Sequence, residues 1–153
     1  MLKKALIVLL FSSSFAFANN LENSTAYNEP KYKISELDVK ILIRQLNNIE
    51  QCIYPDLAKS DYQKIYDNWN VAEHLTMQYF EQRVLNDLLG RENFLTMQND
   101  KASMEYFHQQ HNRFNHQKAN VDQEKCDAFK PTYQEMHQRM QNALAEQKKK
   151  KKQ

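Results

Sequence analysis

The chain has 153 residues, with 21 lysines and arginines against 19 aspartates and glutamates, and a single glycine. This length corresponds to one domain, and one glycine excludes phosphate loops and other glycine-rich sites. Without Lys3, Lys4 and the run Lys148–Lys152, 14 basic and 19 acidic side chains remain. That balance argues against a nucleic-acid partner, because phosphate binding needs basic residues across a folded face.

The first 18 residues are typical of a secretory signal peptide. Lys3 and Lys4 make a charged start, residues 5–15 are apolar or small, and Ala-Phe-Ala at 16–18 fits signal peptidase cleavage. The apolar run is shorter than the ~20 residues that span a bilayer. We therefore expect cleavage after residue 18 and a periplasmic or secreted protein.

The first helix is expected from Ser35 to about Ile53. Ser35 and Asp38 form a capping-box pattern, and Pro55 ends the helix because residues before proline avoid helical angles. The residues before it, 19–33, are polar and show no sustained period, so we expect a flexible leader. One apolar stripe runs along the helix: Leu42, Leu46, Ile49 and Ile53.

Residues 60–90 contain no proline and end at the only glycine, Gly90. Their apolar spacing predicts either one kinked helix or two helices, with a restart at Asn70. Asn70 and Glu73 form a second capping-box pattern. Gly90 suits a helix C-cap with positive φ.

A short helix is expected at residues 91–98, followed by a third long helix that Asn99 or Asp100 caps and that runs to about Lys118. Its apolar positions repeat with 3-4-3 spacing. They are Met104, Phe107, His111 and Phe114.

A fourth helix is expected after Asp122, which is a plausible N-cap. Its near-heptad stripe continues through Pro131, which should kink or restart the helix. We expect residues 148–153 to form a basic, disordered tail. The stripe contains Cys126, Phe129, Tyr133, Met136, Met140 and Leu144.

These elements predict an all-α fold: an antiparallel bundle of about four helices over residues 34–147. In an up-down-up-down bundle, the end of the first helix and the start of the fourth lie at the same end. Cys52 and Cys126 fall at those places, and an isolated pair in an exported chain favours a disulfide. Closing a loop of about 75 residues would stabilise the fold by ~4 kcal/mol.

Methionine and histidine residues on the third and fourth helices form a candidate metal site. Thioether and imidazole ligands suit monovalent copper, and zinc is the second candidate. The alternative is that these side chains pack in the core, as methionines in apolar stripes usually do. The candidate ligands are Met104, His108, His111, Met136, His137 and Met140.

The sequence contains neither Gly-x-Ser-x-Gly nor His-Glu-x-x-His, so we expect no enzymatic activity and no cofactor. The expected function is binding of another macromolecule, most simply a protein, in an inhibitor, immunity or chaperone-like role. Lys148–Lys152 could also contact anionic lipid, at ~1 kcal/mol per lysine.

Overall fold

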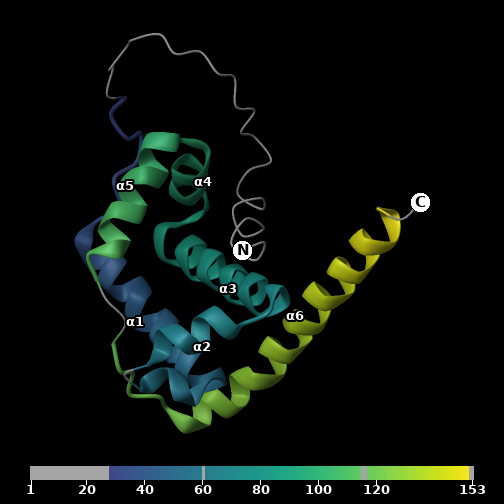
Figure 1. Ribbon diagram of the computed structural model, residues 1–153. Coiled ribbons are helices and arrows are strands. Elements are labelled where there is room, and N and C mark those ends of the chain that lie inside the picture. Colours follow the sequence, from purple (N-terminus) through teal and green to yellow (C-terminus); the bar gives the residue numbers. More distant parts are fainter. Residues whose placement is uncertain (1–27, 60, 115–116, 152–153) are drawn as a thin grey trace.

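A computed structural model describes residues 28–59, 61–114 and 117–151, and every regular element in those ranges is helical (Figure 1). The all-α prediction is therefore confirmed. The predicted signal peptide and residues 19–27 lie outside the described ranges. None of the described helices combines the length and the apolar character needed to cross a membrane. The elements are α1 (Glu36–Ile53), the 3-10 turn η2 (Pro55–Ala58), α2 (Tyr62–Asn68), α3 (Val71–Leu89), α4 (Arg91–Asn99), α5 (Lys101–Asn112) and α6 (Gln123–Lys150).

Side-chain caps set the helix starts where the sequence places them. Ser35 Oγ accepts a hydrogen bond from the Asp38 backbone N–H at 3.0 Å and donates to the Asp38 carboxylate at 2.6 Å. Asn70 forms a complete capping box with Glu73, through hydrogen bonds of 3.0 and 2.7 Å. The restart at Asn70 is confirmed, and residues 62–89 form two helices, α2 and α3.

α3 is the central element, because it contributes to both apolar cores. The C-terminal half of α3 shares one core with α1, α4 and α5, and its N-terminal half shares the other core with η2 and α6. α5 contacts α1 and α4, whereas α6 contacts α1 and α3; the described parts of α5 and α6 do not contact each other. The first core contains Ile34, Val39, Leu42, Ile43, Leu85, Leu89, Met97 and Phe107; the second contains Leu57, Trp69, Met77, Phe80 and Tyr133.

The chain just before α1 is held against the start of α5. The backbone N–H groups of Lys31 and Tyr32 donate to Asp100 Oδ2 at 3.1 Å and to Ser103 Oγ at 2.9 Å. Ile34 is only 2% exposed. The final residues of the predicted leader are therefore anchored, because the capping residues of α5 also accept hydrogen bonds from this segment.

α6 continues through Pro131 without a restart. Proline lacks the N–H that would bond the carbonyl of Asp127 one turn earlier, and both residues are exposed, so water can serve that carbonyl. Lys148–Lys150 also belong to α6, in contrast to the disordered tail expected there. Strong helix formers and cations at a helix C-terminus favour this continuation.

Candidate binding groove between two helices

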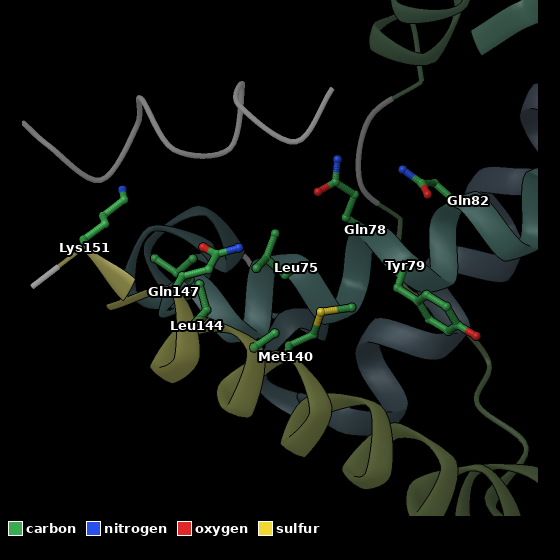
Figure 2. A pocket seen from close by; sticks show the side chains of 10 residues that line it. Leu75, Gln78, Tyr79, Gln82, Met140, Leu144, Gln147 and Lys151 are labelled. Carbon is green, nitrogen blue, oxygen red and sulfur yellow. The ribbon is translucent and has the colours of Figure 1, made fainter. Parts of the chain in front are cut away.

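α3 and the C-terminal half of α6 enclose a groove of about 530 Å³ (Figure 2). α6 extends outward past the body of the molecule (Figure 1), so this half of the helix forms one wall. The described elements that α6 contacts are α1 and α3. The α3 wall consists of Val71, Leu75, Gln78, Tyr79 and Gln82, and the α6 wall of Met140, Ala143, Leu144, Gln147 and Lys151.

The two walls run antiparallel. Thr76 on α3 hydrogen-bonds His137 on α6 at 3.3 Å, and the rings of Phe80 and Phe129 have centroids 5.0 Å apart. Residue numbers therefore rise along α3 as they fall along α6. Val71 and Lys151, both lining residues, accordingly mark the same end of the groove.

Helical spacing gives each wall a gradient of polarity. On α6, Met140, Leu144, Gln147 and Lys151 are four, three and four residues apart, so they share one helix face. The same spacing on α3 joins two apolar residues to two glutamines: Val71, Leu75, Gln78 and Gln82. The groove thus has an apolar middle, one end with an ammonium group and another with amides.

A pair of tyrosines holds α6 against α3 next to the groove. Tyr54, which follows α1, donates its hydroxyl proton to Glu73 Oε1 at 3.0 Å. Its hydroxyl lies 2.7 Å from that of Tyr133, and since Tyr54 has used its only proton, Tyr133 is the donor. Burial raises the pKa of both tyrosines, so both hydroxyls stay protonated and the network holds at neutral pH.

His137 links the same helices one turn closer to the groove. Thr76 Oγ1 donates to the Ala72 carbonyl at 2.6 Å, so it accepts from Nδ1–H of His137. The Gln141 amide nitrogen lies 3.0 Å from Nε2 of His137 and donates to it. In this assignment both ring nitrogens are occupied, and the ring stacks on that of Tyr133 with centroids 5.9 Å apart.

The structure divides the six candidate metal ligands between two places. On α5, Met104 packs against the first core, and His108 and His111 flank the ring of Phe107 at 5.3 and 5.7 Å. Burial lowers the pKa of both histidines. The remaining three lie on α6, which does not contact α5 in the described ranges. They are Met136 against the second core, His137 against Thr76, and Met140 in the groove.

Within the described part of the chain, no group of three or more histidine, cysteine, aspartate or glutamate side chains has an arrangement that could hold a metal ion. The six candidate ligands of the predicted copper or zinc site lie three on α5 and three on α6, and these helices do not contact each other in the described ranges.

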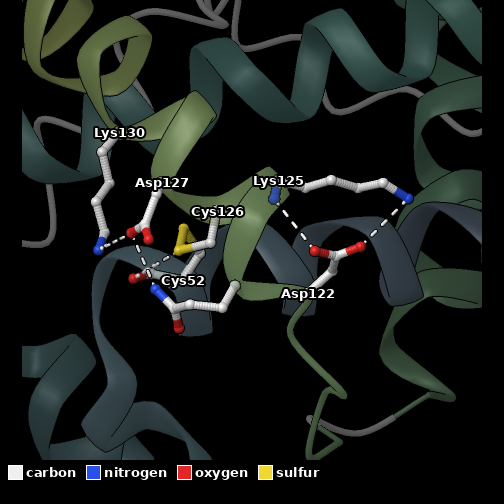
Figure 3. The surroundings of a disulfide bond; sticks show 7 residues. Cys52, Asp122, Lys125, Cys126, Asp127 and Lys130 are labelled. Carbon is white, nitrogen blue, oxygen red and sulfur yellow. Dashed lines mark hydrogen bonds and ion pairs between the residues drawn. A yellow bond between two sulfur atoms is a disulfide. The ribbon is translucent and has the colours of Figure 1, made fainter.

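The disulfide predicted between Cys52 and Cys126 is present, with a Cα–Cα distance of 5.5 Å (Figure 3). It joins the last turn of α1 to the first turn of α6. Beside it, the buried Gln51 side chain donates to the Gln117 carbonyl at 2.6 Å and accepts from the Ala119 N–H at 2.8 Å. Together these bonds fix the start of α6, and so set the direction of the groove wall.

A second set of titratable groups lies where α1, α2 and α3 meet. Glu50 hydrogen-bonds Tyr66 and interacts electrostatically with Glu81. Burial raises the pKa of each carboxyl to about 7 and also raises the pKa of Tyr66. The three groups are partly buried among helices, where they bear on stability.

Sequence reasoning placed Met140 and Leu144 in the apolar stripe of the fourth helix, interpreted Met140 as either a metal ligand or a core residue, and did not identify the groove. A signal was present: the apolar stripe of α6 continues for several turns beyond Tyr133, which is more helix than α1 and the N-terminal half of α3 can cover. The glutamines and Lys151 gave no signal, because polar residues on exposed helix faces are ordinary.

The chain belongs to a family of unknown function, DUF5358, whose model matches residues 25–153. Comparisons with curated proteins and with solved structures find no match. The arrangement of side chains in the groove is therefore the basis for a functional proposal.

Proposed function

We propose that this DUF5358 protein is an exported, periplasmic or secreted binding protein that holds an apolar segment of another protein between α3 and α6, without catalysing a reaction. In this proposal the signal peptide is removed after residue 18, and the helical domain extends from about residue 34 to Lys150, where α6 ends. The disulfide is compatible with an oxidising compartment. The groove is the observation that carries the proposal.

The size of the groove supports a ligand of limited length. Its volume of about 530 Å³ lies within the range of about 300–1,000 Å³ that is typical of ligand sites. The α6 wall from Met140 to Lys151 spans about 16 Å at ~1.5 Å per residue. Two or three turns of a partner helix, or a few extended residues, would cover that length.

The chemistry of the walls favours a peptide. Beside the buried Leu75, the half-buried Met140 and Leu144 offer apolar surface to side chains, at about 25 cal/mol for each Å² removed from water. Gln78, Gln82 and Gln147 offer amides, which can donate to carbonyl groups and accept from N–H groups. An apolar floor with such a rim resembles grooves that receive an amphipathic helix.

The architecture favours a segment of a macromolecule over an enclosed small molecule. The groove has walls from two helices, and most of the α6 residues around its lining positions are exposed. A long chain could therefore enter and leave along its length. The identity of the partner would separate the inhibitor, immunity and chaperone-like roles.

Selection from a displayed library of random 12-residue peptides tests the proposal on the oxidised chain 19–153. We expect enriched peptides that bind Leu144→Glu at least tenfold more weakly, because the variant places a carboxylate in the apolar middle. Ala145→Glu is the matched control, since Ala145 is exposed and does not line the groove. Circular dichroism verifies that both variants fold. An absence of enrichment, or equal binding to Leu144→Glu, would overturn the proposal.

A further inference from the structure

The lysines at the end of α6 differ from most of those in the body of the molecule, where only Lys31, Lys64 and Lys118 among the described lysines lack an ion pair. Six lysines elsewhere form ion pairs with a carboxylate three or four residues away. None of Lys148–Lys151 forms an ion pair with a described residue, although Glu146 lies four residues before Lys150 on the same helix. The six paired lysines are Lys33, Lys40, Lys59, Lys101, Lys125 and Lys130.

These unpaired cations lie at one end of the groove. Lys151 is a lining residue, on the same helix face as Leu144 and Gln147 (Figure 2). Lys148 lies one turn after Leu144, next to that face. The opposite wall ends there at Val71, which brings no compensating charge.

A helix C-terminus favours cations, by about 0.3–1 kcal/mol each. Four adjacent lysines also repel one another, however, and Lys148 and Lys151, three residues apart, are neighbours on the helix surface. Carboxylates placed beside them would relieve this repulsion and form charge-assisted hydrogen bonds.

We propose that the protein segment bound in the groove carries two or more carboxylates at the end beside Val71 and Lys151, followed by apolar residues that fill the middle. This inference rests on the proposed function and adds the chemistry of the partner. At the other end, Gln78 and Gln82 receive uncharged polar groups.

A protein segment fits this site better than an anionic membrane surface does. Helices that lie on membranes present a wide apolar face to the lipid. The outer face of α6 carries Glu135, Gln138, Asn142 and Glu146, all exposed, whereas its apolar residues face α3 in the groove. Approach of a flat lipid surface would thus meet amides and carboxylates.

The same peptide library, counter-selected against Leu144→Glu, tests the inference. Peptides that depend on the groove should contain apolar residues with aspartate or glutamate at one end. Changing those acids to amides should weaken binding to the wild type at least tenfold, measured by fluorescence anisotropy at low salt. The lysine variant K148Q/K149Q/K150Q/K151Q should bind the acidic and amidated peptides equally.

The control variant K33Q/K40Q/K59Q/K101Q removes the same amount of charge away from the groove and should still discriminate between the two peptides. Groove-dependent peptides without an acidic end would overturn the inference and leave the proposed function standing. An absence of groove-dependent peptides would overturn both the inference and the proposed function. Lysine-dependent binding to phosphatidylglycerol vesicles, with no preference for acidic peptides, would assign the lysines to lipid and also overturn the inference.

Discussion

The backbone conformation of Gly90 sets the turn between α3 and α4. Its φ of 76° and ψ of 154° lie in a region that glycine occupies almost alone. A Cβ there would meet no atom within 4 Å, so a side chain would cost backbone energy only. We expect Gly90→Ala to lower the free energy of unfolding by about 1–3 kcal/mol, measured by urea denaturation. Gly90→Asn should lose as much, because asparagine tolerates left-handed helical angles and not this ψ; full stability of either variant would contradict the account.

The hydrogen-bonded pair Tyr54–Tyr133 gives a second prediction for single residues. Tyr133→Phe should reduce the free energy of unfolding by about 1 kcal/mol, because it removes one hydrogen bond and leaves the contact of Tyr54 with Glu73. Tyr54→Phe should cost more, since it leaves the Tyr133 hydroxyl and a Glu73 oxygen without their partner. Tyr79→Phe is the control, because Tyr79 lines the groove and its hydroxyl has no hydrogen bond within the described chain. Equal losses for Tyr54→Phe and Tyr133→Phe would refute the assigned direction of donation.

The position of α6 depends on the disulfide. The disulfide holds the first turn of α6 to the end of α1. Beyond Tyr133, α6 forms one wall of the groove. We expect C52S/C126S to lose ~4 kcal/mol of stability in urea denaturation and to bind groove peptides more weakly, because one wall loses its fixed direction. Wild-type protein reduced with dithiothreitol is the matched comparison. An unchanged unfolding midpoint in both samples would show that the tyrosine and histidine contacts hold α6 unaided.

The helices were predictable because their boundaries depend on neighbouring residues. Asn70 bonds Glu73 three positions away, and Gly90 supplies the positive φ, so both signals can be read from the sequence alone. Which helices pack against α5 and α6 is decided instead by contacts between residues that are far apart in the sequence. An apolar stripe specifies only that a face is covered, and it does not distinguish a core from a groove. Met140 was therefore interpreted as a metal ligand or a core residue, and Leu144 only as part of the stripe, although both line the groove.

At the scale of the whole molecule, the carboxyls of Glu50 and Glu81 make stability depend on pH. Their folded pKa values of about 7 exceed the ordinary value of 4.5, so this contribution is complete below pH 4.5 and is lost as the pH rises through 7. His108 and His111 have lowered pKa values and act in the opposite direction below pH 6.5. A variant that removes one carboxyl separates the two effects.

Glu81→Gln should match the wild type near pH 4.5 and be more stable near pH 8, by up to about 3 kcal/mol. The amide has the size of the protonated acid and cannot ionise, so it avoids the burial of a charge. Thermal denaturation at intervals between pH 4.5 and 8 measures the difference, and Glu92→Gln at an exposed position is the control. Parallel pH profiles for the wild type and Glu81→Gln would contradict the raised pKa.

Site-specific photo-crosslinking in cells that express the protein tests the central claim most directly. A benzophenone side chain replaces Gln78 inside the groove (Figure 2) or Gln138 on the exposed outer face of α6, and mass spectrometry identifies the attached segment. The account predicts an adduct from position 78 alone, to a protein segment whose apolar residues are preceded or followed by acidic ones. Equal adducts from both positions, or none from position 78, would contradict it.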